Sequence, residues 1–509
     1  MRFIVKIAAV AAAALASAPA SANWYMAQSK HFVIYAEEDP QDLQNFATKL
    51  ERFDSAGRHV MRIDDPPIGL GNRVEVYVLP TAAAVQQLAG DKNLDGYYVA
   101  RAEGPLAFVP RHVDNGSEDY TTDLIFFHEY AHHLQMQQLN RPYPEWLVEG
   151  FAEFMSTARF DRDGSVLLGA PAQHRAWDLF EGKQIPLESL LAGTYSNLTP
   201  EERSASVYGR GWLLTHYLTF DTKRSGQLNR YLDAIAAGTP PLDAARLAFG
   251  DLKQLDKDLN AYLNRSRMTA IRIAKENVQP GVIQVVPMSE AAGEVVPLRG
   301  RIKMEKGPAE ALAAQVRAIE SAHPGDELVE ATLAEAELRA DHLDAAEAAA
   351  DRAIKANPRN TEALVLKADS IEKRAKDKEG DERHAAFERA RQIYIAANKI
   401  DTEDPEPLYE FYHSFLQEGR RPNANALAAL HYASDLAPQD LGLRVNSAIA
   451  YLEEGKLKDA RAALAPVAYS PHGGSISETA TRMIAEIDNG DARAALESMD
   501  NKISAAGSR

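Results

Sequence analysis

The chain has 509 residues, a length that fits two or three domains better than one. Its composition, 45% hydrophobic and 25% charged, is typical of a soluble globular protein. A formal net charge of −17 argues against nucleic acid or anionic lipid as a partner. The absence of cysteine excludes a disulfide framework and a lipid-modified cysteine anchor.

Residues 1–22 have the pattern of a secretory signal peptide. Basic residues precede an apolar run over residues 7–16, which is too short to span a bilayer. Ala20 and Ala22 form a small-residue cleavage signal, so we expect cleavage before Asn23, with a retained membrane anchor as the alternative. No later apolar run is long enough to span a membrane. We therefore expect export, to the oxidising periplasm of a Gram-negative bacterium or to the extracellular space.

Residues 23–275 are predicted to form an α+β domain. The runs "HFVIYA" and "RVEVYVLP" are typical of strands, and a helical stretch from about residue 40 to 61 lies between them. The segment "GYYVARAEGPLAFVP" predicts one or two further strands, and the pattern over about 117–265 is helical. Strands followed by a run of helices predict this fold class. Residues 276–306 are again β-branched and Gly/Pro-rich, which predicts a linker or a small β element.

Beyond residue 306 the sequence repeats itself. A proline closes an Ala-rich helical segment at five positions, Pro324, Pro358, Pro405, Pro438 and Pro471. These prolines are 34, 47, 33 and 33 residues apart, and the long interval carries the charged insertion "KRAKDKEGDERH". The pattern resembles the tetratricopeptide repeat, a helix-turn-helix unit of about 34 residues. The resemblance covers residues 307–475 and implies an all-α solenoid that can bind a protein partner. It leaves 476–509 as a C-terminal helical tail. The alternative is a set of helical hairpins that bind no peptide.

The stretch "FFHEYAHHLQ", residues 126–135, contains a candidate metal site. His128 and His132 are four residues apart, so on a helix both rings can point at a single tetrahedral ion. Glu129 lies where a carboxylate can face a water rather than the metal. His133 points about 100° away from His132, so we expect a surface group or a group that supports a ligand. The alternative is a chance pattern on a half-buried helix.

A second helix supplies a candidate third ligand. The segment "PEWLVEGFAEFMSTA" predicts a helix with three carboxylates on one face, Glu145, Glu149 and Glu153. Such stacked like charges cost roughly 0.2–0.5 kcal/mol per pair, and a bound cation would reverse this cost. With a rise of about 1.5 Å per residue, an antiparallel pair of helices places Glu149 level with His132. Glu153 lies one turn deeper, toward His128. We therefore predict Glu149 as the third ligand and Glu153 as the carboxylate that orients a ligating histidine.

His128-Glu129-x-x-His132 with Glu149 inside "WLVEGFAEF" resembles the gluzincin zinc metallopeptidases, the thermolysin and aminopeptidase clan. Within that clan the sequence is most similar to bacterial peptidase MA-like proteins, which often carry tetratricopeptide repeats. The resemblance covers about residues 24–265. It implies one Zn²⁺ per chain, held by the two histidines and Glu149. It also implies that Glu129 is the general base, which deprotonates the attacking water and passes the proton to the departing amine.

The resemblance also suggests a donor to the oxyanion. Tyr208, in "SVYGRGWLLTHYL", is similar to a tyrosine with that role in some members of the clan. His216 is the competing candidate, and an ordinary place in the core is the alternative for both.

The strand "RAEGPLAFVP" corresponds to the edge strand on which the clan lays its substrate. It lacks the Gly-x-Met-Glu-Asn pattern of aminopeptidases, so an endopeptidase that acts on a peptide or protein substrate is the prediction. Two alternatives stay open. One is a non-catalytic repeat scaffold that carries a zincin-like domain, and the other is a zinc hydrolase that acts on a non-peptide bond.

Overall fold

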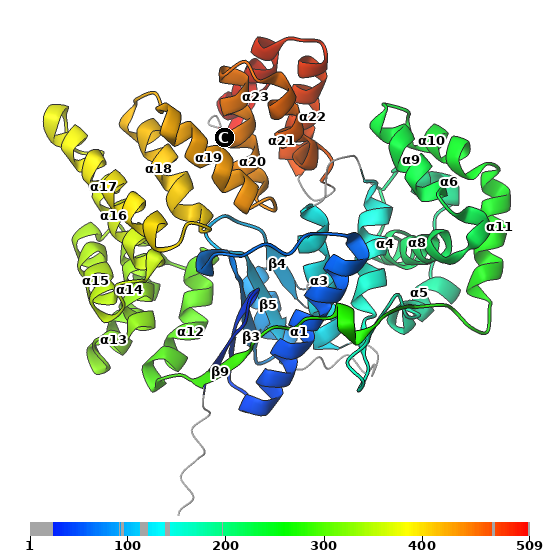
Figure 1. The fold of residues 1–509 in the computed structure, drawn as a ribbon, viewed down its shortest axis with the longest axis horizontal. Helices are drawn as coiled ribbons and strands as arrows, with labels where there is room; N and C mark the ends of the chain where they lie inside the picture. The colour runs from blue at the N-terminus through cyan, green and yellow to red at the C-terminus, as the bar shows by residue number, and fades with distance from the viewer. Residues whose placement is uncertain are drawn as a thin grey trace, which may run out of the picture.

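The fold is described from a computed structural model (Figure 1). It describes residues 24–90, 92, 96–111, 121–137, 143–195, 197–470 and 474–506. The expected signal peptide, residues 1–22, therefore lies outside the described residues. The described chain is mostly helical, and none of its helices combines the length and the apolar character that crossing a membrane requires.

A six-stranded mixed sheet lies at the centre, with the strand order β4-β5-β3-β2-β1-β9. Its strands are β1 (Tyr25–Gln28), β2 (Phe32–Ala36), β3 (Val74–Leu79), β4 (Tyr97–Val99), β5 (Leu106–Pro110) and β9 (Gln284–Pro287). β2, β3 and β5 run parallel, whereas β4 pairs antiparallel with β5 at one edge. All five residues of β5 are buried, as expected for a strand that is covered on both sides. The edge strand next to β5 is therefore β4, and the segment 101–110 that the sequence suggested is not at an edge.

Helices cover both faces of this sheet (Figure 1). On one face lie α1 (Pro40–Met61) and α3 (Thr122–Met136), and on the other lie α2 (Ala82–Ala89) and α12 (Glu290–Lys303). Alternate residues of β3 divide between the two cores, with Val76 toward α1 and α3 and Tyr77 toward α2 and α12. α1 begins with Asp39 as its N-cap, whose side chain accepts from the Gln41 amide.

A second helical layer follows α3 in the chain. It contains α4 (Glu145–Ser156), α5 (Ala176–Phe180), α6 (Leu187–Ala192), α7 (Pro200–Arg203), the π-helix η3 (Ser204–Arg210), α8 (Gly211–Phe220), α9 (Gln227–Ala236), α10 (Pro241–Phe249) and α11 (Leu252–Leu263). Three short strands, β6 (Arg159–Phe160), β7 (Val166–Leu168) and β8 (Ile271–Ile273), form a small antiparallel sheet beside it. α4 packs against both α3 and α8, so it lies at the centre of this layer.

The remainder of the chain is an all-α array of stacked helical hairpins. Its helices are α13 (Ala309–Ala322), α14 (Glu327–Arg339), α15 (Leu343–Ala356), α16 (Thr361–Ala375), α17 (Gly380–Ile400), α18 (Pro405–Glu418), α19 (Ala424–Leu436), α20 (Leu441–Glu453), α21 (Leu457–Ala468), α22 (Gly474–Asp488) and α23 (Ala492–Ala506). Buried alanines let these helices approach closely. The charged insertion lengthens α17, and α22 with α23 extends the array into the predicted tail.

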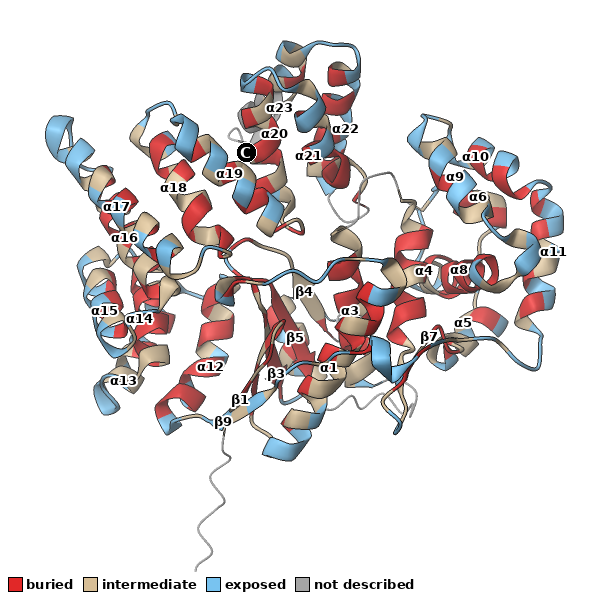
Figure 2. Cartoon of the chain, viewed as in Figure 1, coloured by how far each residue is buried: buried red, intermediate tan, exposed pale blue. Residues whose placement is uncertain are grey.

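The array begins on the sheet and curves back over it (Figures 1 and 2). Near its start, the buried Arg299 of α12 pairs with Glu75 of β3 at 3.1 Å and with Glu362 of α16 at 2.8 Å. Further along, at the end of α19, the Leu436 carbonyl accepts from the Asn72 side chain at 2.7 Å. The array is therefore attached at two separate places, to strand β3 and to the turn that precedes it.

Candidate metal centre

α3 places its aromatic residues in the core and its two histidines on the other side. Thr121 caps the helix by accepting from the Leu124 amide at 3.3 Å, and no glycine or proline interrupts the helix before Met136. Phe127 stacks on Phe53 of α1, with 4.3 Å between ring centroids. This packing fixes the rotation of α3 about its axis, and the rotation directs His128 and His132 toward α4.

The three predicted ligands converge on one point. His128 Nε2 lies 3.3 Å from His132 Nε2 and 3.3 Å from Glu149 Oε2, and His132 Nε2 lies 3.6 Å from the same carboxylate oxygen. A tetrahedral zinc ion with bonds of about 2.1 Å holds its ligand atoms about 3.4 Å apart. The nitrogen and oxygen atoms therefore have both the chemistry and the spacing of a zinc site.

Glu149 reaches this point because α4 and α8 pack unusually closely. A Cβ on Gly150 would lie 2.4 Å from the carbonyl atoms of Gly211, so the two helices meet backbone to backbone. The Glu149 side chain is only 1% exposed and is directed toward α3. One turn earlier, Glu145 forms an ion pair with Arg203 and takes no part in the cluster.

Glu153 lies one turn deeper and contacts the opposite side of the first histidine. Its Oε1 lies 3.3 Å from His128 Nδ1 and accepts from Arg175 Nη2 at 2.5 Å, while its Oε2 lies 2.6 Å from His174 Nε2. Burial acts to raise the pKa of Glu153, but the Arg175 charge and the two histidine hydrogen bonds outweigh it and hold the pKa well below its usual range. An ionised Glu153 can therefore hold the His128 ring with Nε2 directed at the cluster.

Three further side chains support the cluster, and sequence reasoning missed all of them. His174 and Arg175 come from the connection after β7, at a distance along the chain that no helical spacing predicts. Gln135 is one turn beyond His132, and its Oε1 lies 3.0 Å from His132 Nδ1 while its amide nitrogen donates to the Val148 carbonyl at 3.2 Å. The spacing of Gln135 at i+3 was the one available sequence signal.

Glu129 and Tyr208 line the same cavity as the cluster. Tyr208 lies in the π-helix η3, a type of segment that often occurs at functional sites. Its ring stacks on that of His128, with 6.0 Å between centroids. Burial and the nearby Glu149 charge raise the pKa of the Tyr208 hydroxyl well above its usual value, so at neutral pH it is a donor.

Two other histidines do not face the cavity. His216 is fully buried, with Nδ1 2.8 Å from the Tyr262 hydroxyl and Nε2 3.1 Å from the Gly169 carbonyl. Burial lowers its pKa to about 4, which is typical of a core histidine. His133 is also buried, 2.6 Å from the Tyr98 hydroxyl, so a surface position for it was wrong.

The cavity over the cluster has a volume of about 510 Å³ and three walls. Besides the cluster with Glu129, Met136 and Tyr208, it is lined by Tyr97, Tyr98 and Ala100 from the sheet edge and by Gln439, Asp440, Leu441, Gly442 and Ser470 from the helical array.

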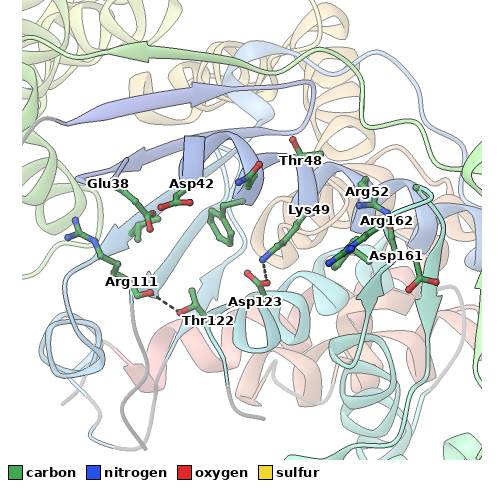
Figure 3. Close-up of a pocket in the computed structure, with 15 residues that line it drawn as sticks. Glu38, Asp42, Thr48, Lys49, Arg52, Arg111, Thr122, Asp123, Asp161 and Arg162 are labelled. Atoms are coloured by element: carbon green, nitrogen blue, oxygen red, sulfur yellow. Dashed lines mark hydrogen bonds and ion pairs between the residues drawn. The ribbon is translucent and has the colours of Figure 1, made fainter. Parts of the chain in front are cut away.

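A separate cavity of about 630 Å³ lies between α1, the start of α3 and the turn that joins β6 and β7 (Figure 3). Its cations and anions compensate one another, as in the Lys49 to Asp123 pair at 2.5 Å. The residues that line it do not include the clustered histidines.

Within the described residues, one other histidine lies in a group with metal-ligand spacing. His31, Glu51 and Asp54 offer atoms within 4.8 Å of one another. Here Arg58 already donates to Asp54 at 2.9 Å. Burial acts to lower the pKa of His31, but hydrogen bonds to Asp65 and Glu51 outweigh it and raise the pKa to about 9. The group is therefore a buried ion-pair network rather than a metal site.

No protein-family model matches the sequence, and no curated protein matches it. Among solved structures, part of the chain resembles a thermophilic TPR protein from Thermus thermophilus, with 18% identity, coverage of 34% of this chain and 89% of the other, and a TM-score of 0.30. It also resembles the MamA RS-1 ArsTM double mutant, with 14% identity, 38% and 97% coverage, and a TM-score of 0.28. MamA from Desulfovibrio magneticus RS-1 is 12% identical, with 40% and 98% coverage and a TM-score of 0.26.

Proposed function

We propose that this protein is an exported zinc-dependent peptidase of the zincin type, with one Zn²⁺ held by His128, His132 and Glu149. The observation that carries the proposal is the convergence of two imidazole nitrogens and a carboxylate oxygen at 3.3–3.6 Å, in a cavity that also holds Glu129. A zinc ion bound there supplies Lewis-acid chemistry, which activates a water and polarises a carbonyl.

The remaining catalytic steps fall to side chains in the cavity. Glu129 is the general base, which takes a proton from the attacking water and then gives it to the departing nitrogen. Tyr208 donates a hydrogen bond to the oxygen on which negative charge develops. Glu153 holds the His128 ring by its other nitrogen.

The proposed substrate is a peptide, since the cavity includes a strand edge that is unpaired among the described strands. β4 pairs with β5 on one side only, and Tyr97 and Tyr98 of β4 line the cavity. An extended peptide can add to such an edge through main-chain hydrogen bonds. Because the edge carries no recognised pattern for a free N-terminus, we propose an endopeptidase.

The test combines zinc content with hydrolysis. Protein purified without chelators should contain about one zinc per chain. Glu129→Gln should keep the zinc and lower the cleavage of casein-derived peptides by about 10²–10⁴-fold, because it removes the general base. Asp123→Asn, in the first turn of the same helix, is the matched control and should leave cleavage unchanged. A zinc content near zero would remove the basis of the proposal, and equal cleavage by wild type and Glu129→Gln would favour a non-catalytic scaffold.

A further inference from the structure

The helical array forms one whole wall of the cavity above the candidate metal centre. Gln439 to Gly442, at the start of α20, and Ser470, after α21, face the same space as His128, Glu129 and His132. The opposite wall is the edge strand β4. The array is therefore part of this cavity and not only a distant platform.

This wall is held firmly in place. Asp440 is the N-cap of α20, and its Oδ1 accepts from the Leu443 amide at 2.9 Å. Its Oδ2 accepts from the Ala102 amide at 2.8 Å, in the connection between β4 and β5. One carboxylate thus ties the start of α20 to the connection that follows β4, which limits how far α20 and β4 can separate.

The array carries, on this wall, a buried hydroxyl that has no hydrogen-bond partner among the described residues. It is the Ser470 hydroxyl, on a residue that is only 5% exposed. Buried polar groups are nearly always paired, so an unpaired one calls for a partner that enters the site. An extended peptide offers a carbonyl or an amide to each wall, because its main-chain groups point alternately to its two sides.

We propose that the array is the second wall of the substrate cleft, and that the Ser470 hydroxyl hydrogen-bonds the main chain of an extended peptide lying between α20 and β4. This inference rests on the proposed function. A cavity of about 510 Å³ between two fixed walls fits a short extended segment. The substrate class is therefore unfolded or extended polypeptide, and the array selects it by restricting the width of the cleft.

Gly442 allows a direct test of the wall. It is exposed and lines the cavity, and a Cβ there would meet only an Asp440 carboxylate oxygen at 3.3 Å. Gly442→Trp should fill the cleft and lower kcat/KM for fluorescein-labelled casein peptides at least tenfold, with zinc content unchanged. Asn425→Trp, at the equivalent second position of α19 and outside the cavity, is the matched control and should stay within twofold of wild type. A Gly442→Trp value within twofold of wild type overturns the proposal.

Ser470→Ala tests the hydrogen bond separately. We expect KM to rise about threefold to tenfold with kcat unchanged, because the bond would contribute to binding of the substrate and of the transition state alike. Ser434→Ala removes a hydroxyl from an equally buried serine in α19 and should leave KM unchanged. An unchanged KM in Ser470→Ala overturns the role of this residue.

Peptide binding separates failure of this inference from failure of the proposed function. If zinc-loaded wild type binds the labelled peptides but does not cleave them, the peptidase proposal fails while the cleft remains testable. Fluorescence anisotropy with the Glu129→Gln protein then measures Kd directly. A Kd at least tenfold weaker after Gly442→Trp supports the wall, and an unchanged Kd overturns it.

Discussion

Two clusters of histidine and carboxylate groups lie within this one fold, and only one is suited to a metal ion. His128, His132 and Glu149 face a cavity, whereas His31, Glu51 and Asp54 are all buried in the packing between α1 and the sheet. The second cluster already contains a cation, since Arg58 donates both to Asp54 and to the Asp64 carbonyl. Ligand-like spacing is therefore insufficient, and the local charge balance and the access to solvent separate the two cases.

The largest expected difference between the clusters is in zinc content. Glu149→Gln removes the one anionic ligand of the triad, so zinc bound after purification without chelators should fall from about one per chain to near zero. Glu145→Gln, one turn earlier on α4, should retain the metal, because that residue pairs with Arg203. Atomic absorption on both variants measures this, and full zinc in Glu149→Gln would contradict the ligand assignment.

Removal of Arg58, the cation inside the second cluster, should lower the free energy of unfolding rather than the zinc content. Arg58→Met leaves Asp54 and Glu51 buried with less compensating charge, so we expect a loss of about 3–5 kcal/mol in the free energy of unfolding. Urea denaturation measures the loss, and Arg246→Met, an exposed residue of α10, is the control. A variant with wild-type stability would show that the ion pair is not needed.

The same network should make stability depend on pH in the alkaline range. The folded-state pKa of His31 is about 9, above its ordinary value of about 6.5. Its contribution is therefore complete below about pH 6.5 and is lost as the pH rises through about 9, in total on the order of 3 kcal/mol. Wild type should lose this much more stability than His31→Gln between about pH 6 and pH 10. Parallel stability profiles for the two proteins would contradict the assignment.

The smallest effect concerns the carboxylate behind the metal ligands. Glu153→Gln weakens the hold on His128 Nδ1, so zinc affinity should fall about 10–100-fold while the ligand set stays intact. Competition with a chromophoric chelator measures the affinity. Glu145→Gln again serves as the control on the same face of α4, and equal affinities would leave Glu153 a purely structural role.

Local spacing was enough to predict the parts of the site that lie on two consecutive helices. His128 with His132, and Glu149 with Glu153, are each four residues apart, and the structure brings the two pairs together. The other two partners of Glu153, His174 and Arg175, and the outer wall of the cavity could not be predicted in this way. His174 comes from the connection after a short strand, and Ser470 lies more than 300 residues from the histidines in sequence. Such residues meet the site only through tertiary packing, which no short-range pattern encodes.

The edge strand shows a second limit of sequence reasoning. Residues 106–110 have the stronger strand pattern, but that pattern is typical of burial on both faces. The short, half-buried Tyr97–Val99 forms the edge instead. The strand that lines the cavity is therefore the one with the weaker strand pattern in the sequence.

The backbone contact between Gly150 and Gly211 limits which sequences this site can tolerate. Gly150 directly follows Glu149, and Gly211 follows the π-helix that carries Tyr208. A methyl group at either glycine would push α4 and α8 apart. The contact thus sets the distance between Glu149 and Tyr208. Substitutions in the surrounding core are tolerated only if they keep this contact.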